Sequence, residues 1–311
     1  MRSAGTAFPS TDLFSKLADA LIKHSPVNKT TEPNLAAALN AAIAQPGRLV
    51  RAQLVFQGCF AQNLPESDSL ALATAIEYFH HASLLYDDLP CMDNSISRRG
   101  RPCLHRVYGE ATTILAALAL VNRAYALIHD VLSTQPRGIR TAANACVEKV
   151  LGAGGILGGQ ARDLRYSEHP PSAREVLQIA VKKTSMLFQL AVYFPAIFGS
   201  PGPHERRALR GLCVYWGLMY QITDDLNDVL STNIATGKTT GRDQSLNRPN
   251  LALATSVPQA RNQLMRLLAL ADRTVQLLGQ NSRWLHLVTF HHTYFSEFTR
   301  QKALLGARSA A

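Results

Sequence analysis

Hydrophobic residues recur along most of the chain with the spacing of an α-helix. In the segment QLMRLLALADRTVQLL, for example, Leu264, Leu267 and Ala271 fall on one stripe at the i, i+3 and i+7 positions. The alternation of period two that marks a half-buried strand is not convincing anywhere. The same helical spacing predicts further helices over residues 12–24, 33–45, 67–88, 111–133, 139–160, 173–199, 203–231 and 282–305.

The breaks between these segments are short and rich in glycine, proline and small polar residues, as in NLPESDS, STQPRG, SEHPPSA and GSPGPHE. None is long enough to suggest a linker between domains, and the sequence shows no internal repeat. We therefore expect a single all-α domain over residues 1–311, built as a helical bundle.

Composition supports a globular protein, because 47% of the 311 residues are hydrophobic, which is ample for a full core. The richest apolar run, TTILAALALV, ends at Asn122 and Arg123, so no membrane span is predicted. The N-terminal residues lack the apolar core of a secretory signal, which favours a cytoplasmic location. The five cysteines show no CxxC spacing, which argues against a disulfide framework and a zinc site.

The net charge of +10 points to anionic partners. Nucleic acid, membrane surfaces and phosphorylated metabolites all carry suitable charge. Lysine and arginine are spread along the chain, without a basic block or interleaved aromatic residues, so a nucleic-acid partner is disfavoured.

Two clusters of aspartates lie on otherwise apolar helices. In the second cluster, YQITDDLNDVL, Asp224 and Asp228 are four residues apart and project from one face of a helix. Like charges at this spacing destabilise an isolated helix, so a positive group should offset them. A solvent-facing acidic turn is the alternative, but it fits poorly with the apolar neighbours. The full set of acids is Asp87, Asp88 and Asp93 in DDLPCMD, and Asp224, Asp225 and Asp228 in DDLND.

Paired carboxylate clusters suit a site where Mg²⁺ meets a phosphorylated substrate. Mg²⁺ takes one or two carboxylates per ion and keeps its other positions for water and phosphate oxygens. We therefore predict magnesium ligands among Asp87, Asp88, Asp93, Asp224 and Asp228.

These motifs make the chain resemble the trans-isoprenyl diphosphate synthases of the polyprenyl synthetase family, over about residues 46–250. DDLPCMD is similar to the first aspartate-rich motif of that family and DDLND to the second. The resemblance implies an isoprenoid synthase-type helical bundle around a central apolar cavity, several Mg²⁺ ions per site, isopentenyl diphosphate and allylic diphosphates as substrates, and a homodimer.

Further positions match the family's motifs. The family's positions that hold the diphosphate of isopentenyl diphosphate are matched by Arg48 and Arg51 in PGRLVRAQL, by His80 and by Arg99. The position that faces the allylic diphosphate is matched by Arg98. By the same resemblance, the remaining substrate-binding or catalytic positions are Gln160, Asp163, Lys183, Thr184, Gln221, Lys238 and Arg242. Taken alone, the arginines could be surface charges and His80 a packed histidine.

The sequence also departs from the family pattern. Ala117 and Leu118 stand where the family commonly has Gly-Asp, which removes an acid expected in the interior. The other departures are Arg48 for lysine, Ala52 for proline, Tyr220 for phenylalanine, and Asn94, Ser95 and Ile96 for acids. The glycines of LGAGGILGGQ are attributed to close helix packing, since no strand precedes them as in a phosphate-binding loop.

The resemblance implies that the chain length of the product is limited by the side chains of the helix below Asp87. Ala82, five residues upstream, is small, and Ser83 lies beside it, so the growing chain has room. Tyr78 and Phe79, one turn lower, would form the floor of the pocket. This favours a C20 product, geranylgeranyl diphosphate. Farnesyl diphosphate, a non-catalytic modulating subunit and a terpene cyclase are the alternatives.

Overall fold

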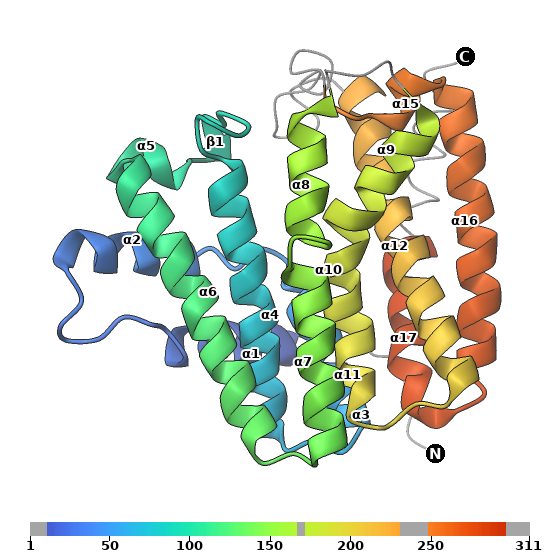
Figure 1. Cartoon of the computed structure of the whole chain (residues 1–311), viewed down its shortest axis with the longest axis horizontal. Coiled ribbons are helices and arrows are strands. Elements are labelled where there is room, and N and C mark those ends of the chain that lie inside the picture. The colour runs from blue at the N-terminus through green and yellow to red at the C-terminus, as the bar shows by residue number, and fades with distance from the viewer. Residues whose placement is uncertain (1–10, 167–171, 231–247, 297–311) are drawn as a thin grey trace.

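The computed structural model describes residues 11–166, 172–230 and 248–296. Nearly all of its regular structure is helical, which confirms the all-α prediction (Figure 1). The first half contains α1 Thr11–Lys23, α2 Pro33–Ile43, α3 Val50–Ala61, α4 Glu66–Asp87, β1 Ser97–Arg98, β2 Arg101–Pro102, α5 Leu104–Tyr108, α6 Glu110–Ser133, α7 Arg137–Leu151 and α8 Ile156–Leu164. The second half contains α9 Ala173–Ala180, η2 Val181–Ser185, α10 Met186–Phe188, η3 Gln189–Tyr193, α11 Phe194–Ile197, α12 Pro203–Leu230, α15 Leu251–Ala254, α16 Val257–Leu278, η4 Ser282–Trp284, α17 Leu285–Phe290 and η5 His291–Ser296.

The two acidic motifs end up at the same end of the bundle. Helix α4 is buried on most sides between α3 and α6, and α12 packs against α16 and η2. Both helices run upward in Figure 1 and terminate at its upper end, where the β1–β2 hairpin also lies. A helix that is apolar all round belongs in a core, so the aspartates that end α4 are fixed by its packing.

Three local features differ from the sequence prediction. Helix α3 was not predicted, because Gln53 and Gln57 interrupt its apolar stripe although Gln53 is buried. The two-residue strands β1 and β2 are too short to give a period-two signal. The helix predicted over 139–160 is two helices, α7 and α8, which are separated by a turn that contains glycines.

The helical run from Ala173 to Ile197 contains two π-helical turns, η2 and η3. Such turns are rare and often mark functional sites, because the extra residue widens the helix locally. The turn η3 ends at Tyr193, two residues before Pro195, which has no amide hydrogen to donate to the helix. The turn η2 carries two residues singled out from the sequence, Lys183 and Thr184.

Near the C-terminus, His291 joins three helices. Trp216 Nε1 of α12 donates to His291 Nδ1 at 3.0 Å, so His291 Nε2 carries the hydrogen and faces Asp272 Oδ1 of α16 at 2.7 Å. His291 is fully buried. Its environment is therefore that of a packing residue.

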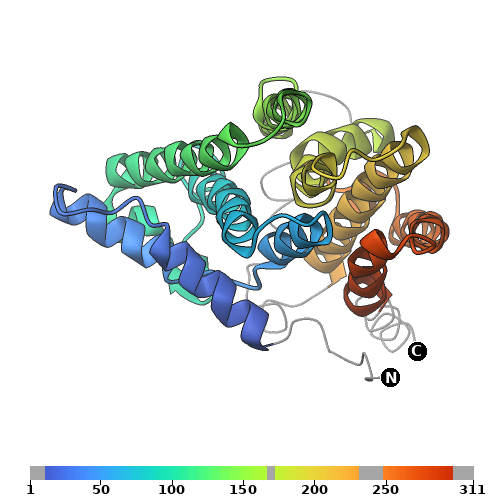
Figure 2. The same cartoon turned by 90° about the horizontal axis from the view of Figure 1, so that it is seen from below.

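Helix α6 is the one described helix that is long and apolar enough, by length and composition, to cross a membrane. This is weak evidence for a span, because the core helices of globular proteins pass the same test, and one side of α6 packs on α4 (Figure 2). The expectation of a lost interior acid at position 118 is wrong. Leu118 is 55% exposed on the outer side of α6, whereas Ala117 is buried.

Candidate active site

The first acidic motif lies where α4 ends and the chain folds back on itself. The Asp93 amide donates to the Asp87 carbonyl at 3.0 Å, which holds the two residues close together. Asp88 is buried, and its carboxylate receives the guanidinium fork of Arg98 at 2.7 and 2.8 Å. Asp88 is thus engaged by Arg98, and Asp87 and Asp93 remain as the acids of this motif that face the site.

A pocket of about 180 Å³ lies beside these acids. One wall is apolar, and the rest carries carboxylates, cations and an amide. It is lined by Asp93, Asp163, Val176, Ile179, Ala180, Lys183, Gln221, Asp224, Arg248 and Pro249. The pocket therefore brings together residues from both acidic motifs, α8, α9 and η2 with Arg248, which is 155 residues from Asp93 in sequence.

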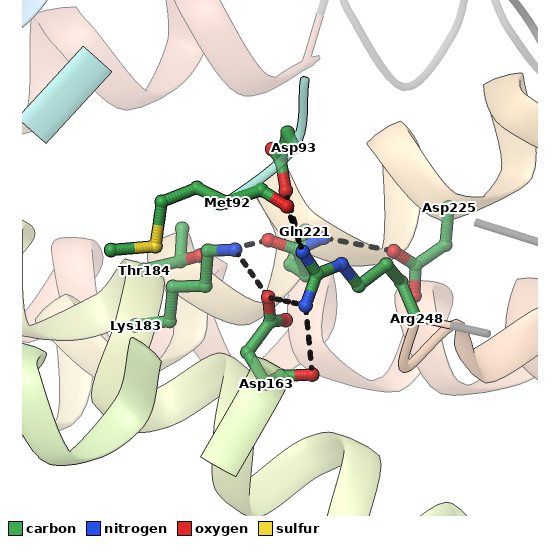
Figure 3. A network of polar contacts seen from close by, with 8 residues as sticks. All are labelled: Met92, Asp93, Asp163, Lys183, Thr184, Gln221, Asp225 and Arg248. Carbon is green, nitrogen blue, oxygen red and sulfur yellow. Dashed lines mark hydrogen bonds and ion pairs between the residues drawn. The ribbon is translucent and has the colours of Figure 1, made fainter. Parts of the chain in front are cut away.

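Opposite charges hold the pocket together (Figure 3). Lys183 Nζ donates to Asp163 Oδ2 at 2.8 Å. Burial opposes its charge, but the neighbouring Asp163 and Asp87 raise the pKa of Lys183, so it stays protonated. Asp87 itself is half-buried, and burial raises its pKa to about 6, although Lys183 opposes the shift.

Arg248 is a central residue of the pocket that sequence reasoning missed. Its Nη2 donates to Asp93 Oδ1 and to the Met92 carbonyl, both at 2.9 Å, and its Nη1 donates to the Asp163 carbonyl at 3.3 Å (Figure 3). The guanidinium therefore bridges the first acidic motif and α8. The sequence signal was weak, because a lone arginine in NRPN has no charged neighbour, and only the fold brings it to the acids.

The three aspartates of the second acidic motif have different surroundings. Asp224 is exposed to the pocket, and Asp228 is half-buried one turn further along α12. Asp225 is buried and points away, since its carboxylate accepts from Gln221 Nε2 at 2.9 Å and from the Leu251 amide at 2.8 Å. Through these contacts Asp225 anchors α15 to α12.

Gln221 and Thr184 form a short relay beside the pocket. The Thr184 hydroxyl donates to Gln221 Oε1 at 2.8 Å, and the opposite end of the same amide donates to Asp225. Gln221 is therefore held in one orientation. On α8, Gln160 has a buried Nε2 with no hydrogen-bond partner among the described residues, so it could donate to a ligand.

A second group of cations lies next to α3 and the hairpin. Arg51 Nη1 is 3.2 Å from His80 Nε2, and Arg99 Nη1 donates to the Gln45 carbonyl at 2.9 Å. The Arg99 guanidinium packs so closely on Gly47, at a φ of +67°, that a Cβ there would clash with it. Burial and the Arg51 charge lower the pKa of His80 well below its ordinary value, so its ring is neutral.

Arg48 belongs to the same group. The Gln53 side chain donates to the Arg48 carbonyl at 2.9 Å. Burial raises the pKa of Tyr294 in η5, and the charges of Arg48 and Arg51 oppose this shift. The structure thus brings the predicted Arg48, Arg51, His80 and Arg99 into one region, while Lys238 and Arg242 lie outside the described residues.

The four residues predicted to set product length are on α4. Ala82 is buried, and the Ser83 hydroxyl donates to the His80 carbonyl at 2.8 Å. Tyr78 is turned toward α1, where its hydroxyl donates to the Leu21 carbonyl at 2.5 Å. Phe79 packs edge-on against Tyr125 of α6, with 5.0 Å between ring centroids. The two residues predicted to form the floor of the product pocket therefore point in different directions. Phe79 packs on α6, and Tyr78 packs on α1.

The donor set suits Mg²⁺ but does not form a complete cage. Among the described residues, no three aspartate, glutamate, histidine or cysteine side chains are close enough to hold an ion by themselves. Mg²⁺ binds through one or two carboxylates and substrate phosphates, so a preformed cage is not required. Of the predicted ligands, Asp93 and Asp224 line the pocket and Asp87 lies beside it, so these three carboxylates could hold the ion, and metal binding here stays a prediction.

Comparison with known proteins gives a consistent result. The family model described as Polyprenyl synthetase matches residues 32–280. The chain is 35% identical over 210 residues to a geranylgeranyl pyrophosphate synthase of Capsicum annuum, covering 66% of this chain and 56% of that protein, so it spans little more than half of that relative's length. It is 32% identical over 228 residues to a farnesyl diphosphate synthase of Geobacillus stearothermophilus, covering 73% and 77%.

Solved structures agree on the fold. An FPP/GFPP synthase from Zymomonas mobilis is 26% identical, with a TM-score of 0.76 over 91% of this chain and 96% of that one. A geranyltransferase from Helicobacter pylori, solved with magnesium and isoprenyl diphosphate, has a TM-score of 0.73 over 98% and 100%. Its identity is 22%, so it supports the fold alone.

Proposed function

Because the chain belongs to the polyprenyl synthetase family, we propose that it is a short-chain trans-prenyl diphosphate synthase. It joins isopentenyl diphosphate head-to-tail to an allylic diphosphate, with geranylgeranyl diphosphate as the main product. The observation that carries this proposal is the pocket in which Asp93, Asp224, Lys183 and Arg248 converge beside Asp87.

The pocket provides charge for a departing diphosphate. Ionisation of an allylic diphosphate creates a carbocation and a pyrophosphate anion, so cations must be in place as that negative charge develops. Lys183 and Arg248 face the pocket, and Arg98 is fixed nearby by Asp88. Bound Mg²⁺, held by Asp87, Asp93 and Asp224, would add positive charge at the same oxygens. The apolar wall of Val176, Ile179 and Ala180 excludes water that would quench the cation.

The second group of cations suits a diphosphate that is held without being cleaved. Arg48, Arg51 and Arg99 can bind phosphate oxygens through guanidinium forks. His80 is neutral and its Nδ1 is buried without a partner among the described residues, so its ring can orient Arg51 without adding charge. Isopentenyl diphosphate bound here would present its double bond to the carbocation.

The test is an incubation of purified protein with Mg²⁺, isopentenyl diphosphate and each of the C5, C10 and C15 allylic diphosphates. Released pyrophosphate and extended prenyl diphosphates are expected. A cyclic hydrocarbon would indicate a cyclase instead. An absence of turnover together with binding to an active synthase would indicate a modulating subunit.

Product length is proposed to depend on Ala82. Ala82→Tyr fills the space below Asp87 and should shorten the main product from C20 to C15. Ala142→Tyr, at an exposed position of α7, is the control and should leave the product unchanged. The products are separated by chromatography after dephosphorylation. An unchanged product from Ala82→Tyr would show that another residue closes the pocket.

We also propose that the protein is a homodimer that forms through α6. This helix exposes Ile114, Leu115, Leu118 and Tyr125 along one stripe, with Leu115 54% exposed. Contiguous apolar side chains on a helix surface mark an interaction site. Leu115→Glu should convert a dimer to a monomer in light scattering. Leu277→Glu, at a 64% exposed leucine of α16, should not.

A further inference from the structure

Glu77 is a buried acid that the proposed reaction does not yet use. It lies on α4 with 2% of its surface exposed. Its Oε2 is buried without a hydrogen-bond partner among the described residues, and its Oε1 is 3.7 Å from His81 Nε2, which is too long for a hydrogen bond. An ionised carboxylate is costly in such a place unless cations face it.

Arg51 of the second group of cations contacts α4 beside Glu77, because its Nη1 lies 3.2 Å from Nε2 of His80, which is one turn from Glu77 on the same face of the helix. From α3, Arg51 and the Ala52 amide favour its charged form, and from the hairpin Arg99 does the same. Burial outweighs these groups and raises the pKa of Glu77 to about 7. On its own helix, burial lowers the pKa of His81 to about 4, so His81 is neutral and adds no charge.

We propose that Glu77 is a positioning residue for the retained diphosphate, whose carboxylate offsets Arg51 and Arg99 in the empty site and takes up a proton from solvent when the diphosphate binds them. This inference rests on the proposed function, because it takes isopentenyl diphosphate as the ligand of these arginines.

The physical reason is a competition for the same positive charge. A diphosphate carries more negative charge than one carboxylate and binds guanidinium groups through paired hydrogen bonds. Once Arg51 and Arg99 are neutralised by it, a charged Glu77 is left buried with a nearby anion, and both effects favour the protonated acid. The proton adds to Oε2, which has no described partner to displace.

Calorimetric titration of isopentenyl diphosphate into the full-length protein tests this. At about pH 8 the ligand is already fully ionised, so the difference in heat between two buffers of different ionisation enthalpy reports protons taken up by the protein. We expect uptake of up to about 0.9 proton per site, because a group with a pKa near 7 is about nine-tenths ionised there. The Glu77→Gln variant should take up no proton when the ligand binds. The Glu66→Gln variant, changed at an exposed position of the same helix, should take up as many protons as the wild type.

Steady-state kinetics provide a second readout. Above the pKa of Glu77, the KM of the wild type for isopentenyl diphosphate should rise up to about tenfold per pH unit, because binding then requires a proton. In Glu77→Gln the KM should be nearly independent of pH. The amide has the shape of the acid and no charge to bury, so the variant should fold, and the wild-type profile alone tests the idea if it does not.

Equal proton uptake in the wild type and Glu77→Gln, or binding to the wild type without uptake, would overturn this inference and leave the proposed function intact. An absence of any binding would overturn the proposed function and the inference together.

Discussion

Gly159 of α8 is a position at which a single methyl group should disturb the site. A Cβ added there would lie 2.6 Å from the Lys183 amide nitrogen and 2.7 Å from the Lys182 carbonyl carbon, both in the backbone of η2. Backbone atoms cannot rotate away as a side chain can. Gly159→Ala must therefore push α8 and η2 apart.

The size of the effect follows from the distances. Ordinary contact begins at 3.4 Å, so the two segments must separate by about 0.8 Å. Overpacking of this kind lowers the free energy of unfolding by about 1–3 kcal/mol. The separation would also pull Lys183 from Asp163, a residue of α8, which now lie 2.8 Å apart. Because displacement of a catalytic group by about 1 Å can reduce the rate 100-fold, kcat should fall by about that factor.

Urea unfolding and pyrophosphate release measure the two effects in the same preparation. Gly138→Ala, on α7, is the control, since a Cβ there meets nothing within 4 Å. It should gain up to about 1 kcal/mol from the better helix propensity of alanine, with unchanged kcat. A Gly159→Ala protein with wild-type stability and kcat would refute the claim that backbone contact between α8 and η2 positions Lys183.

Three further outcomes are expected. Arg248→Met should reduce kcat at least about tenfold, and Arg248→Lys should recover part of it, because one ammonium cannot replace the fork; equal activity of all three proteins would contradict this. Asp225→Asn should lower the free energy of unfolding by about 1–3 kcal/mol with little change in kcat. Asp224→Asn should instead lower kcat with little change in the free energy of unfolding. Urea unfolding and turnover measure the two quantities. Burial lowers the pKa of His81 and His286 to about 4, below the ordinary value of 6.5. Each is neutral when folded, so the stability that each contributes is full above about pH 6.5 and falls toward pH 4 by up to about 1.4 kcal/mol per pH unit. His286→Gln should remove one of these two contributions from the slope in urea unfolding.

The sequence predicted which helices carry the chemistry better than how each residue is used. Apolar spacing located α4 and α12, because a buried helix needs long apolar runs whatever its neighbours are. The individual acids could not be ranked this way. Asp88 and Asp225 look like their neighbours in sequence, yet Arg98 and the Leu251 amide engage them, and these partners come from other segments.

Glycines show the same limit. Close packing was predicted as the reason for the glycines of LGAGGILGGQ, and this is confirmed for Gly159. Gly155 has a different reason, since it lies in the turn between α7 and α8, and a Cβ there would lie 2.1 Å from the carbonyl oxygen of Val150 at the end of α7. The sequence cannot distinguish a glycine packed against another helix from a glycine in a tight turn. Both positions lack room for a Cβ, and they differ only in which backbone segment lies next to them.

Under the proposed function, a diphosphate that enters the pocket meets cations that are already paired with carboxylates. Arg248 donates to Asp93, and Lys183 donates to Asp163, so these cations are engaged before a diphosphate arrives. A diphosphate that draws these cations away leaves carboxylates without their partners, which is unfavourable unless another positive charge reaches them. Inorganic pyrophosphate should therefore bind at least about tenfold more tightly with Mg²⁺ than with a chelator present, because the ion replaces the cations at the carboxylates. Calorimetry measures both affinities. In Asp93→Asn the dependence on Mg²⁺ should shrink, and equal affinities with and without the metal in the wild type would show that no such exchange takes place.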